Sequence, residues 1–442
     1  MTDPGAAPVG LPSVRQGWWI LAVLVVLYIA SMLDRQIIAL LIEPIKASLQ
    51  IGDLETSLVY GLAFAVFFCL AGIPVGFAID RYPRRPIVFC GVVIWSIATA
   101  CCGLSSQYWH LAVSRFAVGA GEAVLSPAAY SLLADALPKR QLGRALGIFG
   151  IGGALGTGVA LAIGGFLLLA LPAGGLTTAL GAFETWQLTF IVVAIPALCL
   201  APLIYSFPEP RRRERLATRP TSLRAGINFI TSRAGFYGRF FVGNGCLVLC
   251  TYGFAAWVPT FLVRRFGLTM PEASHWVALA AVVAVPIGLF GLGYATDRLF
   301  QRGRRDAHML LFSGIGLVFA ILGWCMASAH SLSTALVCIF AIFAASGIAP
   351  IAAAVPLTTP NEYRGQVSAV YLLATNLLGV GLGPTAVAAF TDLYFKSDAM
   401  VGWSVAAVMI TFGPLSSALL YSARRPMIVA IDAASEWADC SS

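Results

Sequence analysis

Charged side chains are scarce in this chain of 442 residues. Asp, Glu, Lys and Arg make up 11% of the sequence, and 59% of it is hydrophobic; a soluble domain carries about 25% charged residues. A chain this poor in charge cannot cover a surface that faces water, so most of its surface must face lipid. The formal net charge of +8 fits the basic cytoplasmic loops of a membrane protein, and we expect no nucleic-acid partner.

Motifs for catalysis, metal binding and ATP hydrolysis are also missing. The sequence contains no HExxH, GxSxG or GxxxxGK[ST] pattern, which excludes these zinc, nucleophile and phosphate-binding sites. Its ten cysteines form no CxxC pair, and its four histidines have no metal-ligand spacing. Free cysteine in apolar runs packs as a small hydrophobic residue. We therefore expect no metal, no cofactor and no enzymatic activity.

Long apolar runs recur along the whole chain. A membrane-spanning helix needs about twenty mostly apolar residues, whereas the strands of a membrane barrel would alternate apolar and polar residues. We predict an all-α membrane protein with twelve transmembrane helices, at 18–42, 57–79, 86–104, 108–136, 145–170, 186–207, 239–262, 276–296, 308–328, 333–357, 367–391 and 400–423. The first run is too long for the core of a signal peptide.

Basic residues between the spans are concentrated on one side of the membrane. With the N-terminus inside, the outside loops hold only Lys46, Arg264, Arg265 and Lys396. Cytoplasmic loops are enriched in Lys and Arg, so we expect both termini in the cytoplasm, with the protein a monomer in a bacterial inner membrane. The inside segments hold Arg15, Arg81, Arg84, Arg85, Lys139, Arg140, Arg144, the cluster from Arg211 to Arg239, Arg298, Arg302, Arg304, Arg305, Arg364, Arg424 and Arg425.

A polar segment divides the chain into two similar halves. We predict an N-terminal six-helix bundle at 1–207, a cytoplasmic arginine-rich linker at 208–238 that lies against anionic headgroups, and a C-terminal six-helix bundle with a tail at 239–442. The sequence GFAIDR (76–81) follows the second predicted helix, and GYATDR (293–298) follows the eighth. These matches indicate pseudo-two-fold symmetry, and such repeats surround a central site in many transporters.

The motif after the second helix resembles the signature of the major facilitator superfamily, Gly-x-x-x-Asp-Arg-x-Gly-Arg-Arg. Gly76, Asp80 and Arg81 match it, as do the two arginines at 84–85, but Pro83 replaces the second glycine. The fourth predicted helix carries Arg-x-x-x-Gly-x-Gly at 115–121, which is similar to a further motif of the superfamily. The resemblance covers essentially the whole chain.

Three shorter segments resemble the spinster-like branch of this superfamily. They are DRQII (34–38), EPIK (43–46) and GAGEA (119–123) followed by Ser126-Pro127. That branch includes exporters of sphingosine phosphate and lysophospholipids. The organic anion–proton symporters also carry an arginine late in the first helix and a glutamate in the fourth. The resemblance implies a secondary active transporter for lysolipid-like molecules, with sugar-acid symport or multidrug export as the alternative.

Four ionisable residues fall inside the predicted helices: Asp34, Arg35, Arg115 and Glu122. Each costs roughly 2.5–3.5 kcal/mol on insertion scales, and such residues usually face a cavity or a partner. Asp34 and Arg115 both lie roughly 10–12 Å from the outer helix ends, so we predict that they pair. Glu122 lies deeper on the face of Arg115, about 10 Å away. A static ion network that only fixes helix packing is the alternative.

The chemistry of these four residues suggests how proton movement is coupled to substrate movement. We predict Glu122 as the main proton carrier with Asp34 assisting, and Arg35 and Arg115 as substrate-binding residues. Burial favours a neutral carboxyl and a nearby arginine favours a charged one, so a helix movement that changes either effect loads or releases a proton. A channel would need a continuous lined pore, and a pump would need a domain for ATP; neither fits this sequence.

The second half contributes polar and aromatic residues to the predicted cavity. We predict that Asn244, Tyr252, Trp257 and Asn376 contact the substrate, with ordinary packing as the alternative for the two aromatic residues. A cavity with one charged wall and one apolar wall suits an amphipathic charged molecule. The charged residues at the cytoplasmic helix ends are predicted to gate and support the fold. They are Asp80, Arg81, Arg84, Arg85, Asp135, Asp297 and Arg298, with Asp135 as an acceptor for Arg84 or Arg85.

Overall fold

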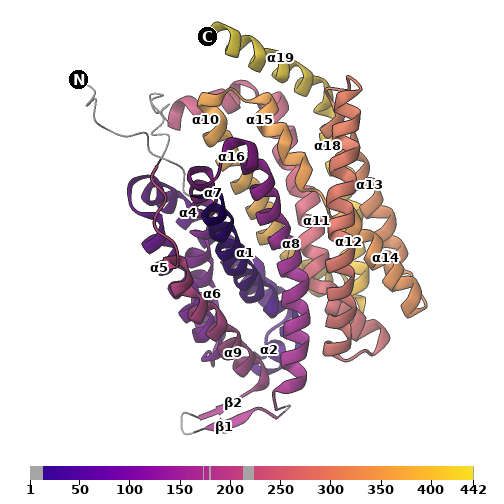
Figure 1. The fold of residues 1–442 in the computed structure, drawn as a ribbon. Helices are drawn as coiled ribbons and strands as arrows, with labels where there is room; N and C mark the ends of the chain where they lie inside the picture. The colour runs from indigo at the N-terminus through magenta and orange to yellow at the C-terminus, as the bar shows by residue number, and fades with distance from the viewer. Residues whose placement is uncertain (1–12, 173, 179–180, 213–222, 442) are drawn as a thin grey trace.

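The computed structural model describes residues 13–172, 174–178, 181–212 and 223–441 (Figure 1). The predicted linker arginines Arg213, Arg215 and Arg219 lie outside the described residues. The start of α1 (Val14–Gln36) and α19 (Arg424–Ser441) lie at one end of the helix bundle, and a small β-hairpin lies at the other (Figure 1). We call these ends the termini face and the hairpin face.

The prediction of twelve transmembrane helices is confirmed. Twelve helical segments in the described part of the chain are long and apolar enough to cross a membrane. Several combine more than one element, because 3-10 or π turns interrupt them. In order, they are α1 (Val14–Gln36) with η1 (Ile37–Leu40); α3 (Asp53–Ser57), η2 (Leu58–Ala63) and α4 (Phe64–Arg81); α5 (Arg84–Gly103); α6 (Tyr108–Glu122) with α7 (Leu125–Ala136); α8 (Lys139–Ala170); α9 (Thr185–Leu200) with η3 (Ala201–Tyr205); α11 (Ala234–Phe266); α12 (Met270–Gln301); α13 (Ala307–Ala327); α14 (Leu332–Ala345), η4 (Ala349–Ala353) and α15 (Ala354–Thr358); α16 (Asn361–Thr375), η5 (Asn376–Gly381), α17 (Leu382–Ala389) and η6 (Phe390–Phe395); and η7 (Asp398–Met400) with α18 (Val401–Ser422).

Five further elements lie outside the spans. They are α2 (Ile42–Leu49), the antiparallel strands β1 (Leu176–Thr178) and β2 (Gly181–Phe183), α10 (Leu223–Ser232) and α19 (Arg424–Ser441). The predicted linker therefore contains a helix, α10, and the first residues of α11. Phe229 of α10 stacks on Tyr363 of α16 with ring centroids 4.5 Å apart, so α10 packs on the second bundle.

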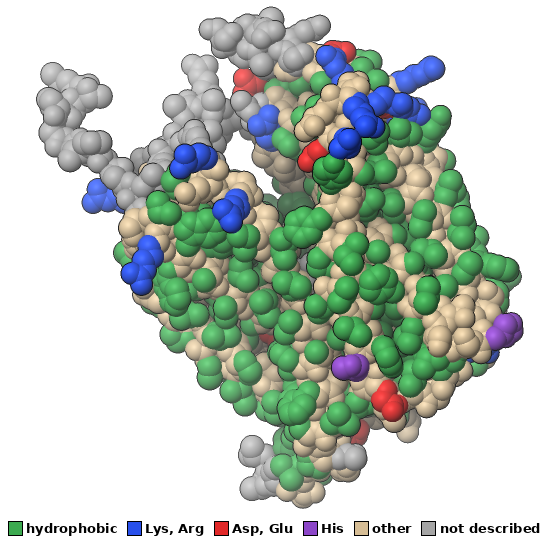
Figure 2. Space-filling view, turned by 45° about the vertical axis from the view of Figure 1, so that its right-hand side comes forward, with side chains coloured by type: hydrophobic (Ala, Val, Ile, Leu, Met, Phe, Trp, Pro, Cys, Tyr) green, Lys and Arg blue, Asp and Glu red, His purple; other side chains and the backbone are tan. Residues whose placement is uncertain are grey.

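The two bundles touch in the half of the molecule near the hairpin face. There α8 packs along α12, and η2 with α4 packs against η5 and α17. Gly61 faces the main-chain carbonyls of Val380 and Gly381, which leave no room for a side chain. Toward the termini face, Gly72 of α4 and Gly147 of α8 face open space. Figure 2 shows the bundles separated at that end.

Candidate functional site

The four ionisable residues predicted from the sequence lie together between α1 and α6. Arg35 Nη2 is 2.6 Å from Glu122 Oε2, and Arg35 Nε is 3.2 Å from the same oxygen. Ser31 Oγ donates to this oxygen over 2.8 Å. The Glu122 side chain is 0% exposed and that of Arg35 is 12% exposed. A fully buried carboxylate is thus neutralised by an arginine that remains accessible. We call Asp34, Arg35, Arg115 and Glu122 the central charged cluster.

The predicted pairing of Arg115 with the Asp34 side chain is wrong for this conformation. Arg115 Nη1 donates to the main-chain carbonyl of Asp34 over 3.2 Å. The Asp34 carboxylate turns toward Thr99 and Trp95 of α5, yet neither oxygen has a hydrogen-bond partner among the described residues. Arg115 Nε and Nη2 also have no hydrogen-bond partner among the described residues. Buried polar atoms without partners are costly, and both Asp34 and Arg115 are fully buried.

Aromatic rings of α4 line the cluster. The Arg35 guanidinium lies 4.6 Å from the centroid of Phe64 and 5.4 Å from that of Phe68. The Arg115 guanidinium lies 5.6 Å from the centroid of Phe64. A ring face attracts a cation within about 6 Å, so Phe64 holds two arginines that would otherwise repel each other. Phe64 and Phe68 could not be predicted from the sequence, because they are apolar residues in an apolar run.

The predicted residues of the second bundle divide into two groups. Tyr252 of α11 is close enough to Arg35 to interact with it electrostatically, and it is half-buried. The other three bond within their own bundle. Asn244 donates to the Tyr371 hydroxyl over 3.1 Å, the Trp257 indole donates to the carbonyl of Pro384 over 3.0 Å, and Asn376 donates to the carbonyl of Leu372 over 2.9 Å. Of the four residues predicted in the second bundle, Tyr252 therefore faces the central charged cluster in this conformation.

A second charged group, which the sequence did not predict, joins the bundles at the hairpin face. Arg264 of α11 contacts Asp53 of α3 through two hydrogen bonds of 2.7 and 2.9 Å, and Glu43 of α2 through one of 2.7 Å. Lys46 of α2 lies 2.5 Å from Asp53 and 2.9 Å from Asp398 of η7. We call these five residues the hairpin-face ion cluster. It connects elements of the first bundle to elements of the second.

Lys46 remains a cation in this cluster. Partial burial alone would lower its pKa, but hydrogen bonds to Asp53 and Asp398 outweigh burial and raise the pKa above its ordinary value. Oxygens of Asp53, Asp392 and Asp398 lie within 4.8 Å of one another, as metal ligands would. Because Lys46 and Arg264 already supply positive charge there, these carboxylates need no metal ion.

Charged residues at the termini face bond within each bundle. Arg84 forms an ion pair with Asp135, as predicted, and a second one of 2.7 Å with Glu209. Asp80 and Asp297 are exposed, and neither makes an ion pair among the described residues. They do not bridge the bundles here, which agrees with the separation of the bundles at this face.

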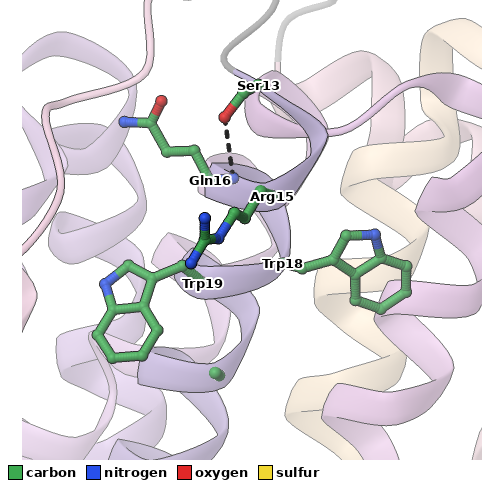
Figure 3. Close-up of a pocket in the computed structure, with 6 residues that line it drawn as sticks. Ser13, Arg15, Gln16, Trp18 and Trp19 are labelled. Atoms are coloured by element: carbon green, nitrogen blue, oxygen red, sulfur yellow. Dashed lines mark hydrogen bonds between the residues drawn. The ribbon is translucent and has the colours of Figure 1, made fainter.

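A cavity of about 630 Å³ lies at the start of α1, on the termini face. Trp18 and Trp19 point to opposite sides of α1, with Arg15 between them (Figure 3). The Trp19 indole donates to Ser206 over 3.0 Å, and the Arg144 guanidinium lies 5.8 Å from the Trp18 ring. None of the residues in the central charged cluster lines this cavity.

A sequence model of the Major Facilitator Superfamily matches residues 24–384, and it covers both bundles. The chain belongs to this superfamily. Its members are membrane transporters, so the fold and the transporter class follow together, and the central charged cluster lies within the matched region.

Relatives with curated descriptions fall into more than one group. The chain is 24% identical to an MFS-type efflux pump of Mycolicibacterium smegmatis (strain ATCC 700084 / mc(2)155) over 383 residues, which cover 86% of this chain and 85% of that protein. It is 25% identical to a sphingosine-1-phosphate transporter of Danio rerio over 336 residues, which cover 71% of this chain and 63% of that protein. The predicted resemblance to spinster-like proteins is thus found again in the comparison of full sequences.

A solved structure supports the fold. A bacterial homolog of the human lysosomal transporter Spinster, in an inward-facing and unoccupied conformation, superposes with a TM-score of 0.78. The two chains are 22% identical, and the match covers 95% of this chain and 98% of that one. Helix order and bundle arrangement are therefore those of the superfamily.

Proposed function

We propose that this transporter is proton-coupled, works by alternating access and moves an amphipathic, negatively charged molecule of lysolipid type. The observation that carries the proposal is the pair between Arg35 and Glu122. A buried carboxylate in contact with an accessible arginine can exchange its partner when an anion arrives. A pair that served helix packing alone would not need an accessible arginine.

The orientation follows from the loop charges. We place the termini face in the cytoplasm and the hairpin face outside, in a bacterial inner membrane, and take the working unit as a monomer. The hairpin-face ion cluster then closes the outside, while the bundles stand apart on the inside. The described conformation is thus inward-facing, and transport requires that the cluster open and the termini face close.

Substrate binding and protonation are linked through Arg35. An anionic headgroup that engages Arg35 removes the partner of Glu122. A buried carboxylate without a nearby cation favours its neutral form, so Glu122 takes up a proton. Arg35 is thus the counter-charge of Glu122 as well as a substrate-binding residue. Asp34, whose oxygens have no hydrogen-bond partner among the described residues, is the second proton carrier, with Arg115 as its neighbouring charge.

The apolar surroundings favour an amphipathic substrate. Phe64 and Phe68 flank the Arg35 guanidinium, and Tyr252 faces it from the second bundle. A headgroup bound at Arg35 therefore has aromatic surface beside it for an apolar chain. A small sugar acid would satisfy the arginine but would leave this surface uncovered. Export of hydrophobic drugs is the further alternative, which the similarity to an efflux pump favours.

Transport from proteoliposomes with only an imposed pH gradient tests the proposal. The panel is a lysophosphatidylglycerol, a hexuronic acid and a cationic hydrophobic dye. We expect the pH gradient to drive movement of the lysolipid and not of the other two. Movement of the hexuronic acid alone would place the protein with the organic anion symporters. Movement of the dye alone would identify a drug exporter, and the absence of any dependence on the gradient would contradict proton coupling.

A further inference from the structure

Arginines gather at the termini-face end of the second bundle. They lie in the last turn of α12, on the turn between α12 and α13, and at the start of α19. Figure 2 shows basic side chains grouped there, directly above a hydrophobic surface. We call this group the α12–α13 arginine patch; its members are Arg298, Arg302, Arg304, Arg305, Arg424 and Arg425.

Part of the patch is neutralised by carboxylates and part is not. Asp306 accepts from Arg304 over 3.2 Å and from Arg424 over 2.6 Å, and Arg305 pairs with Asp432. Arg298 and Arg302 are exposed and make no ion pair within the described part of the chain. Arg298 Nη1 instead donates to the Tyr294 hydroxyl over 2.5 Å. Two arginines are therefore available to an external anion.

The surface that leads to these arginines is apolar. One face of α12 exposes large hydrophobic side chains along most of its length, ending one turn before Arg298. Phe290 is 61% exposed and Tyr294 is 63% exposed, and residues three or four apart share one helix face. The exposed face consists of Trp276, Leu279, Val283, Ile287, Phe290 and Tyr294.

The equivalent turn of the first bundle uses its arginines internally. Arg84 is fully buried against Asp135 and Glu209, and Arg85 donates to the main-chain carbonyls of Ile204 and Tyr205. Only Arg81 stays exposed without such a partner among the described residues. The first bundle therefore leaves one arginine free at this turn, Arg81, whereas the second bundle leaves two, Arg298 and Arg302.

We propose that the α12–α13 arginine patch binds the headgroup of an anionic phospholipid. Arg298 and Arg302 contact the phosphate, for which the planar guanidinium is well suited. The acyl chains lie along the exposed face of α12. The site is separate from the central charged cluster, and it does not depend on the identity of the transported molecule.

Binding of short-chain phosphatidylglycerol to the full chain in neutral detergent tests this site. Each basic residue near an anionic lipid surface contributes about a fivefold gain in affinity, so R298Q/R302Q should weaken binding roughly 25-fold. The matched control is R265Q, which removes an exposed arginine at the hairpin face and should change affinity less than about threefold. Phosphatidylcholine should bind weakly to all three proteins, and melting temperatures in detergent alone should agree.

Three outcomes would overturn the proposal. Unchanged phosphatidylglycerol binding in R298Q/R302Q would show that these arginines do not hold the lipid. An equal loss in R265Q would show a general effect of net charge. If millimolar inorganic phosphate displaced bound phosphatidylglycerol as well as unlabelled phosphatidylglycerol does, the site would be one for a free anion, without a contribution from the α12 face.

Discussion

Replacing Asp53 by Asn should destabilise the conformation that is closed at the hairpin face. The substitution keeps the shape of the side chain and removes its charge. Asp53 is 0% exposed and Arg264 is 9% exposed in their side chains. Arg264 would lose a partner that it contacts over 2.7 and 2.9 Å, and Lys46 would lose one at 2.5 Å.

The size of the effect follows from burial. Breaking a buried ion pair costs about 3–5 kcal/mol, whereas exposed pairs contribute about 0–1 kcal/mol. Arg264 keeps Glu43 at 2.7 Å, and Lys46 keeps Asp398 at 2.9 Å, so we take roughly 2 kcal/mol, between these limits. That free energy lowers the ratio of closed to open conformations about 30-fold. A ratio of about 99 to 1 would then become about 3 to 1.

Distances between spin labels at the hairpin face measure this ratio. Gln107, at the start of α6, and His330, just before α14, are exposed on different bundles and can carry the labels once the exposed native cysteines are replaced. Asp53→Asn should add a longer distance to the distribution. Glu184→Gln is the control, because Glu184 bonds to Ser48 within the first bundle over 2.7 Å and should add none. An unchanged distribution in Asp53→Asn would refute the role given to the ion cluster.

Four further substitutions test other parts of the account. Asp80→Asn and Asp297→Asn should slow the exchange between conformations at least threefold and leave substrate affinity within about twofold, because both carboxylates lie at the termini face. Rapid-mixing fluorescence would measure the exchange rate, and equilibrium binding would measure the affinity. A loss of affinity with a normal exchange rate would contradict the gating role of these residues. Gly61→Ala should lower the melting temperature, since a Cβ would lie within 2.8 Å of the carbonyls of Val380 and Gly381 and overpacking costs about 1–3 kcal/mol; Gly72→Ala, with open space around it, should not. Asp306→Asn should lower the free energy of unfolding by no more than about 1 kcal/mol. Burial raises the pKa of the Asp306 carboxyl, but Arg304 and Arg424 outweigh burial and hold the pKa below its ordinary value. The stabilisation by this carboxyl is therefore present above a pH of about 4, the unfolded pKa, and is lost as pH falls through the folded pKa. A difference in melting temperature that grows in acid would contradict that sign.

The sequence predicted the helices well because the membrane allows few alternatives. Backbone groups in lipid must bond within their own segment, so a long apolar run is a helix. The pairing of Arg84 with Asp135 was also predictable, since both residues lie at the same depth at neighbouring helix ends. α2 and α10 were missed, because short helices beside a membrane have no long apolar run.

The contacts inside the site needed information that depth does not give. Asp34 and Arg115 lie at similar depth, but the rotation of α1 about its axis turns Asp34 to α5 and its neighbour Arg35 to Glu122. The hairpin-face ion cluster was hidden for another reason. Lys46 and Asp398 are 352 positions apart, and no local pattern links residues so distant in the chain.

Proton exchange on substrate binding tests the central proposal most directly. Purified transporter in weakly buffered detergent solution, with a pH indicator, would receive the substrate found in the liposome panel. The account predicts uptake of about one proton per bound molecule near neutral pH, seen as a rise in pH, because the ligand separates Arg35 from Glu122. Glu122→Gln should bind the substrate without this uptake, and Glu184→Gln should behave as the native protein. Unchanged proton uptake in Glu122→Gln would show that the proton binds elsewhere, with Asp34 the next residue to replace.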